Sequence, residues 1–342
     1  MNRHCRWRNG LALLWSALLV LPQARADPKQ QPPKPNDLTE MSLEELANIE
    51  VTSVGKKQQK LSEAAAAVYV ITQEDIRRSG VTSIPEALRM APGLDVARID
   101  SSTWAVSARG FNGQYSSKML VLVDGRSVYT PLFSGVYWDT VDLLLEDIER
   151  IEVIRGPGAT MWGANAVNGV INIISKRAAD TQGGLMSTGT GNEEQGFGGF
   201  RYGGRLGSNA YYRVYSKYFQ RSDLLTPAGG SAADAWHTAR GGFRMDWESG
   251  KDSVTAEGDL YGGRNGQPLQ TFSLSPPYSQ AVDGQIRSSG GDMLTRWRRI
   301  LSPSSEMELQ VSYGRTDRRD VLLGEARDTV QVDFQHRFTL SP

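Results

Sequence analysis

The chain has almost no cysteine or histidine. Of its 342 residues one is Cys and three are His. Cys5 and His4 lie in an N-terminal segment that we predict to be removed, which leaves His237 and His336 far apart. This scarcity excludes disulfide bonds, thiol chemistry and a Cys/His metal centre from the mature chain. We therefore expect no metal site and no cofactor.

Long apolar runs are also scarce, and the one near the N-terminus is short. Residues 1–10 carry three arginines and no acid, residues 11–21 are almost wholly apolar, and Ala24-Arg25-Ala26 has a small-x-small pattern. These features predict a secretory signal peptide over residues 1–26. An uncleaved anchor is the alternative, but the run is too short to span a bilayer as a helix.

The chain also has no large excess of either positive or negative charge. The chain has 38 basic and 38 acidic residues, and residues 1–26 contain four Arg and no acid, so the mature chain carries 34 − 38 = −4. A nucleic-acid-binding protein would show a basic patch or stripe, so we expect no nucleic-acid partner. We identify no Ser/His/Asp or paired-carboxylate arrangement, so we expect no catalytic residues and no enzyme.

Residues 27–60 have the composition of a linker. Their first part is rich in Pro, Gln and Lys and should be extended. Residues 38–49 favour a short helix, with Ser42 as N-cap. A β-prone pentamer follows, Glu50-Val51-Thr52-Ser53-Val54.

Residues 61–177 predict a compact α+β domain. Apolar runs indicate strands at residues 68–72, 119–123, 151–154 and 170–174, and alternation indicates another at 94–99. Helices are expected after Thr72 and over residues 83–90, where Pro falls near the first turn. Asp124-Gly125 is a hairpin turn signal.

Residues 178–342 lose the helical period and alternate strictly between apolar and polar residues, as in 306–315 and 330–338. A soluble sandwich also alternates. However, these segments reach the length of about ten residues that a tilted membrane strand needs. Aromatic residues lie near segment ends, and tight turns alternate with longer polar stretches such as 268–289, which we expect to be a loop. The pattern predicts a transmembrane antiparallel β-barrel.

About eight such segments occur in this part. An eight-stranded barrel is filled by its own side chains, whereas a barrel that encloses a plug needs about 22 strands. An open sheet edge in lipid would leave backbone groups unpaired. We therefore expect the chain to be an incomplete barrel, a fragment of a longer receptor.

Four motifs in residues 62–177 resemble the plug of TonB-dependent outer-membrane receptors in order and spacing. They are VYVITQEDIRRSGVTSIPEALRMAPGLDV (68–96), ARGFN (108–112), VLVDG (121–125) and IERIEVIRGPGATMWGANAVNGVINIISK (148–176). The barrel resembles the family by pattern alone. The resemblance implies a plug at 61–177, a partial barrel at 178–342, and a location in the Gram-negative outer membrane with the plug and N-terminus facing the periplasm.

The glycine-rich segment after residue 154 has a second interpretation, a phosphate-binding loop. No Gly-Lys-Ser/Thr follows Gly156-Pro157-Gly158, and a third glycine is missing because that position is Met161. The resemblance instead implies that Arg109 and Arg155 face barrel carboxylates and seat the plug. Ion pairs within the plug are the alternative for both.

The resemblance also implies which segment binds TonB and which residues bind ligand. Residues 50–54 look like a TonB box, an extended segment that pairs with an edge of TonB by strand addition; an unstructured tail is the alternative. Ligand-binding candidates at the plug apex are Arg109, Phe111, Asn112, Tyr115, Tyr129, Phe133 and Tyr137.

The function implied is active uptake of a scarce small ligand, with an iron chelate such as a ferric siderophore as the family default. The partners implied are TonB, its inner-membrane energising complex and outer-membrane lipid. A passive receptor or adhesin barrel with a static plug is the alternative.

Overall fold

The structure is a computed structural model that describes residues 50–53, 59–60, 62, 66–156, 159–163 and 165–339. All of these belong to one compact unit, Met41–Pro342. Among them, no helix is both long enough and apolar enough to cross a membrane. The predicted helix at 38–49 and Val54 lie outside the described residues.

The first part is built on a five-stranded sheet in the order β3-β8-β9-β6-β7. Its strands are β3 (Ala67–Thr72), β6 (Met119–Val123), β7 (Arg126–Ser127), β8 (Ile148–Arg155) and β9 (Gly169–Ser175). The strands β6 and β9 run parallel, and the other pairs are antiparallel. Two small pairs accompany this sheet: β1 (Glu50–Val51) with β2 (Gln59–Lys60), and β4 (Leu94–Arg98) with β5 (Trp104–Ala108).

Short helices join these strands, and local sequence sets their ends. Helix α2 (Gln73–Ser79) begins in a capping box, in which Thr72 Oγ1 accepts from the Asp75 amide and the Asp75 carboxylate accepts from the Thr72 amide; the helix ends at left-handed Gly80. Helix α3 (Ile84–Leu88) has proline in its first turn. The remaining short helices are α4 (Ala159–Trp162), η2 (Leu145–Asp147) and η3 (Ala178–Thr181).

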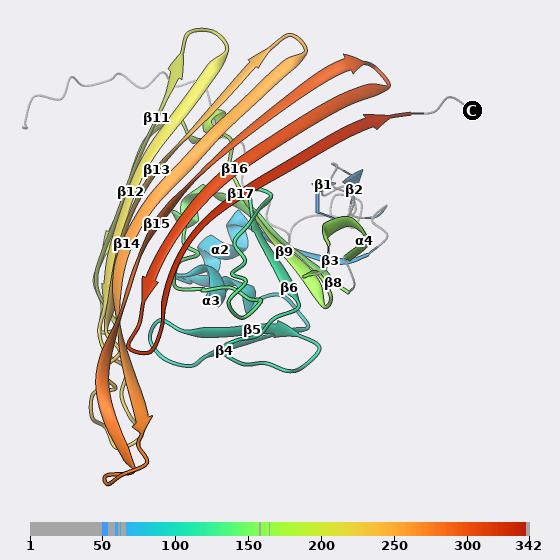
Figure 1. The fold of residues 1–342 in the computed structure, drawn as a ribbon. Coiled ribbons are helices and arrows are strands. Elements are labelled where there is room, and N and C mark those ends of the chain that lie inside the picture. The colour runs from blue at the N-terminus through green and yellow to red at the C-terminus, as the bar shows by residue number, and fades with distance from the viewer. Residues whose placement is uncertain are drawn as a thin grey trace, which may run out of the picture. The chain divides into compact units, whose positions relative to one another are not determined.

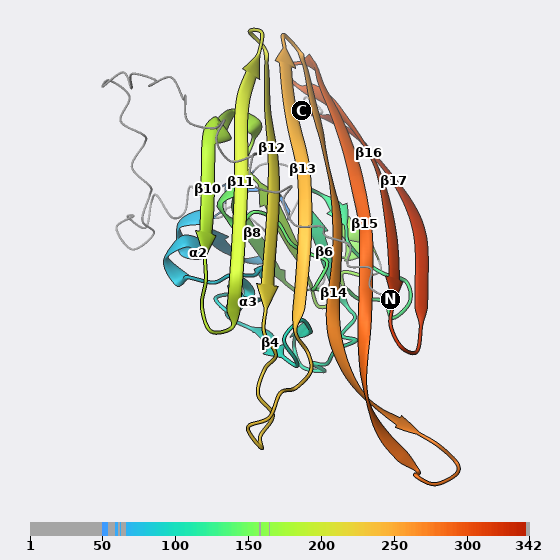
Figure 2. The ribbon, with the colours of Figure 1, turned by 90° about the vertical axis from the view of Figure 1, so that its left-hand side faces the viewer.

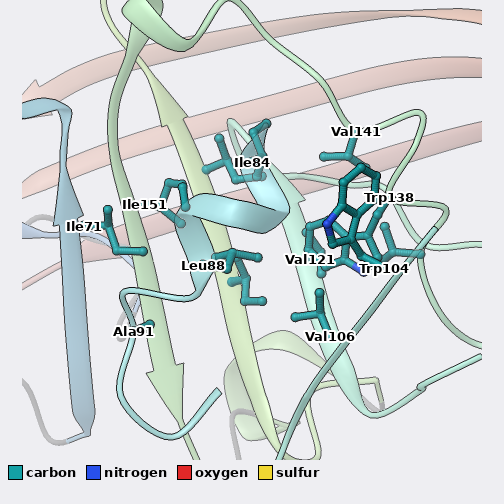
Figure 3. Packing of buried hydrophobic residues seen from close by; sticks show 14 of the residues in the cluster. Ile71, Ile84, Leu88, Ala91, Trp104, Val106, Val121, Trp138, Val141 and Ile151 are labelled. Carbon is teal, nitrogen blue, oxygen red and sulfur yellow. The ribbon is translucent and has the colours of Figure 1, made fainter. Parts of the chain in front are cut away.

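The helices close one face of the five-stranded sheet. Figure 3 shows Ile84 and Leu88 of α3 packed toward Ile151 of β8 and Val121 of β6. All four side chains are at most 1 % exposed. Burying a side chain of this size contributes about 1.5–3 kcal/mol, so this core fixes the loops that leave the sheet.

The second part is one antiparallel sheet of eight strands in sequence order, which Figure 2 shows side by side. The strands are β10 (Gly183–Gly189), β11 (Glu194–Leu206), β12 (Ala210–Arg221), β13 (Trp236–Ser249), β14 (Asp252–Phe272), β15 (Ser279–Ser302), β16 (Ser305–Arg319) and β17 (Gly324–Phe338). The α+β domain lies on the inner face of this sheet (Figure 1), where Arg201 donates to Asp147 and Arg318 donates to Asp139.

The alternation predicted from sequence is confirmed by the register. Phe243, Met293, Tyr313 and Val330 lie in one row across β13 to β17 and are 42–68 % exposed. Their neighbours along the strands face inward and are buried, as Arg244 is, or partly buried, as Gln331 is. An apolar outer face and a charged inner face are what a membrane barrel wall requires.

Two local predictions were wrong. Residues 268–289 are not a loop, because β14 and β15 continue as a paired hairpin as far as residues 272 and 279 and leave only 273–278 as the turn. Strand β5 was not predicted. Its residues are all buried, so they lack the period-two alternation by which a half-exposed strand is recognised.

Candidate functional site

A row of aromatic rings joins two loops at one end of the plug. Phe133 packs edge-on between Tyr115 and Tyr137, with ring centroids 5.1 and 5.0 Å apart. Tyr129 lies in the same loop and donates from its hydroxyl to Ser134 Oγ at 3.1 Å. Edge-to-face pairs contribute about 0.5–1.5 kcal/mol each beyond their buried area. The predicted candidates Tyr115, Phe133 and Tyr137 are therefore brought together by direct contact.

The remaining apex candidates, Arg109, Phe111 and Asn112, are exposed. Phe111 is 90 % exposed, and the Lys118 ammonium lies 5.3 Å from its ring centroid. Arg109, Phe111 and Lys118 all have positive φ, a backbone region that costs non-glycine residues roughly 1–3 kcal/mol each and that clusters at binding sites. Residues 110, 111 and 113–118 line an open pocket of about 390 Å³ together with Asn168.

The barrel wall supports the aromatic row from behind. The Arg318 guanidinium of β16 lies 4.2 Å from the Tyr137 ring centroid, and its Nη1 donates to Asp139 Oδ2 at 2.7 Å. Burial raises the pKa of the Tyr137 phenol to about 12. The second loop is held to β17, where Thr130 Oγ1 donates to Glu325 at 2.9 Å and Arg327 donates to the Tyr129 carbonyl at 3.0 Å.

Arg109 and Arg155 do not pair with carboxylates of the eight described barrel strands. Arg155 Nη1 donates to the Pro92 carbonyl at 3.0 Å, within the plug. The Arg109 guanidinium lies beside Gly156, whose added Cβ would be 3.5 Å from its Nη2. The seating role of both residues stays a prediction.

The observed plug–wall ion pairs mostly have the opposite polarity, with the acid on the plug. Asp147, 4 % exposed, accepts from Arg201 at 2.5 Å and lies 3.6 Å from Arg213. Asp142 pairs with Lys217 at 2.6 Å, and Asp139 with Arg318 at 2.7 Å. The reverse polarity also occurs, between Arg126 and Asp292 at 2.7 Å. Sequence analysis missed these residues because charged residues are common on the inner face of any barrel strand, so their presence does not indicate a contact with the plug.

The predicted TonB box is held against the plug by one buried carboxylate. Glu152 of β8 is fully buried and accepts from the backbone amides of Thr52 at 3.0 Å and Ser53 at 2.8 Å. Val51 is also fully buried and pairs with Gln59 in the β1–β2 ladder. This segment is therefore docked on the plug.

Two further side chains hold Ser53. Trp162 Nε1 donates to its carbonyl at 2.6 Å, and Asn172 Nδ2 donates to its hydroxyl at 3.0 Å. Glu152 is itself paired with Arg150 at 2.8 Å. Because Glu152 and Asn172 belong to the sheet that also carries β6 and β7, the docked segment and the apex loops share one scaffold.

No group of three His, Cys, Asp or Glu side chains that could hold a metal ion occurs within the part of the chain that the structure describes.

Comparisons with known proteins identify both parts of the chain. Residues 60–170 match the family model of the TonB-dependent Receptor Plug Domain. The vitamin B12 transporter BtuB of Vibrio vulnificus is 31 % identical over 147 residues, which is 42 % of this chain and 23 % of the transporter. The BtuB of Vibrio cholerae is 32 % identical over 141 residues, 41 % of this chain and 23 % of that protein. The matches thus span less than a quarter of these relatives.

Solved structures share the fold over a longer part of the chain. The ferripyoverdine receptor of the Pseudomonas aeruginosa outer membrane has a TM-score of 0.60 at 14 % identity, covering 83 % of this chain and 40 % of the receptor. The ferric preacinetobactin receptor BauA of Acinetobacter baumannii has a TM-score of 0.61 at 16 % identity, covering 79 % and 40 %. Residues 60–170 therefore belong to the plug-domain family of TonB-dependent receptors, and the eight-stranded sheet that follows shares its fold with part of the solved receptors.

Proposed function

We propose that the protein is a TonB-dependent transporter that takes up a scarce small ligand across the outer membrane, with a ferric siderophore as the leading candidate. The relatives are vitamin B12 transporters by name, and the proteins of similar fold are receptors or transporters of iron chelates. Vitamin B12 and ferric citrate are the first competing ligands, because the ferric citrate transporter FecA also shares the fold.

The observation that carries the proposal is the docking of residues 51–53 by Glu152. TonB would bind by strand addition, which requires an extended segment that can leave its docking site on the plug. Here the segment is held mainly through its backbone, by a carboxylate and by two donors, Trp162 and Asn172. We propose that TonB captures residues 50–54 after their release from Glu152 and pulls on the plug along the chain, which leads to β3.

The ligand would bind at the aromatic apex. Exposed Phe111 and Tyr115 offer apolar contact area, and Arg109, Asn112 and Lys118 offer donors beside it. Aromatic rings with convergent polar groups are typical of small-molecule sites. We assign Tyr129, Phe133 and Tyr137 to the floor of this site and Arg109 and Arg155 to the seating of the plug.

The proposal divides the chain into four segments. Residues 1–26 serve export, residues 27–60 are the periplasmic linker with the TonB box, residues 61–177 form the plug, and residues 178–342 form the N-terminal part of the barrel.

The buried ion pairs between plug and wall favour one alternative, a passive receptor or adhesin whose plug never moves. Val51→Pro separates the two, because proline cannot donate to a ladder. We expect cells with the variant to bind ligand normally but to lose accumulation of radiolabelled iron–siderophore complex, vitamin B12 or ferric citrate, whichever the wild type takes up. Unchanged accumulation in the variant would favour the passive receptor.

A further inference from the structure

Three arginines and a histidine stand directly opposite one another across four strands. His237 of β13 pairs in register with Arg264 of β14, Arg264 with Arg287 of β15, and Arg287 with Arg319 of β16. All four are exposed. Like charges placed opposite in a sheet destabilise it. An anion lying against the row would offset this repulsion. We call these four residues the basic row.

The basic row lies on the outer face of the barrel wall. Leu260 is four residues before Arg264 on β14, and the period of two puts both on one face. Leu260 is 73 % exposed and belongs to the apolar outer belt. Within the described residues, Arg319 is paired with Asp317 at 3.2 Å, whereas Arg264 and Arg287 pair with no carboxylate. The middle of the row therefore presents two unneutralised cations beside the membrane surface.

An apolar groove of about 570 Å³ lies next to the basic row. Met186, Phe200, Tyr218 and Leu260 line it, together with the small residues Ala239 and Gly262. Ala239 and Gly262 are two residues from His237 and Arg264, so the groove begins on the membrane side of the row. Its lining suits a hydrocarbon chain.

The position of Arg264 along β14 places the basic row at one membrane surface. Arg264 lies 13 residues from the tight turn at Lys251, which is about 43 Å of strand at roughly 3.3 Å per residue. A tilt of about 40° reduces this to a height of about 33 Å, compared with an apolar band of about 25 Å. The long hairpin β14–β15 continues beyond the row, away from the short turns (Figure 2). The row thus lies at the headgroup level of the outer leaflet.

We propose that the basic row and this groove form a binding site for a phosphorylated anionic lipid of the outer leaflet. Arg264 and Arg287 bind its phosphate groups, since guanidinium groups match phosphate geometry, and one acyl chain lies in the groove. Clusters of basic residues at a membrane surface bind anionic headgroups. The site is on the outer face of the wall and is separate from the plug apex, so it does not depend on the transported ligand.

The test is native mass spectrometry of the protein, purified in detergent and freed of lipid, during titration with bisphosphorylated lipid A. Each basic residue near an anionic surface contributes about fivefold in affinity, so we expect Arg264→Gln with Arg287→Gln to weaken binding about 25-fold. Gly262→Leu should weaken it as well, because space for a larger side chain is open there and the new side chain would fill the groove. Arg299→Gln is the control, since Arg299 lies on the same outer face at the opposite rim, 47 % exposed and near Asp252.

Two further probes separate the possible sources of phosphate. Dephosphorylated lipid A should bind as weakly to the wild type as the bisphosphorylated lipid binds to the double variant. Inorganic phosphate should fail to displace the lipid at millimolar concentration. Unchanged affinity in the double variant, equal binding of the dephosphorylated lipid, or displacement by inorganic phosphate would each overturn the proposal. Unchanged heat-modifiable gel mobility will show that the variants are folded.

Discussion

Arg318 of the barrel wall donates to Asp139 of the plug at 2.7 Å, and both side chains are buried. The same guanidinium covers the ring of Tyr137, the last member of the aromatic row at the plug apex. The same Asp139 oxygen also accepts from Asn265 of β14 at 2.7 Å. One carboxylate thus ties the apex loops to two strands of the wall.

Replacing Asp139 by Asn should loosen this attachment. Removal of one partner of a buried ion pair leaves an uncompensated charge and costs about 3–5 kcal/mol. We expect the denaturation midpoint of the plug, followed by tryptophan fluorescence, to fall. Asp328→Asn is the control, because its pair with Arg315 is exposed on the outer face, and we expect no measurable change there. Equal midpoints for D139N and wild type would show that the pair does not hold the plug.

Gly135 should be irreplaceable in the apex loop. A Cβ added there would lie 2.4 Å from the Phe133 ring and 2.6 Å from the Ser116 carbonyl oxygen, and the backbone contact cannot be relieved by a side-chain rotation. We expect Gly135→Ala to cost about 1–3 kcal/mol and to weaken ligand binding at the apex.

The matched control for this change is Gly113→Ala, in the neighbouring loop, where an added Cβ meets nothing within 4 Å. Ligand affinity, measured by calorimetry, should be lower in G135A than in G113A. If both variants bind as the wild type does, the aromatic row does not belong to the ligand site.

Glu152→Gln should release residues 51–53. The amide side chain can no longer offer two charged oxygens to the Thr52 and Ser53 amides, and a hydrogen bond to a charged group contributes about 1.5–3 kcal/mol. Because the only cysteine, Cys5, lies in the predicted signal peptide, a cysteine placed at Val51 reports accessibility cleanly. We expect its labelling rate to rise about tenfold or more in E152Q.

Glu149→Gln on the same strand is the control for this change. Glu149 is 44 % exposed and pairs only with Arg150 among the described residues, so its loss should leave labelling unchanged. A similar labelling rate in E152Q and wild type would mean that the carboxylate does not control the release of this segment.

The Tyr137 phenol should lose its proton at a higher pH than an exposed tyrosine does. Burial raises its pKa to about 12 from an ordinary value of 10.0, so the folded state holds this proton longer than the unfolded state does. Its contribution to stability is present below pH 10 and is lost as the pH rises through about 12. The absorbance titration of wild type minus Tyr137→Phe should show one phenol ionising near pH 12. A midpoint near pH 10 would place this ring in solvent.

Much of the secondary structure could be read from local sequence. Thr72 as a helix cap and the apolar run 119–123 are short-range signals, and each formed the predicted element. The alternation after residue 178 gave the outer and inner faces of the wall, because the side-chain period of a strand is two. The exceptions were β5, which is buried on both faces and carries no period, and residues 268–289, which form a paired hairpin and not a loop.

What the sequence by itself determined was therefore the type of most elements, the faces of the strands and, through linked motifs, the resemblance of residues 62–177 to a plug domain. Only the tertiary structure decided which charges meet. Asp139 and Arg318 are 179 residues apart, and the basic row depends on a register fixed by strand pairing. Such contacts are set by how whole elements pack, so no local pattern of residues encodes them.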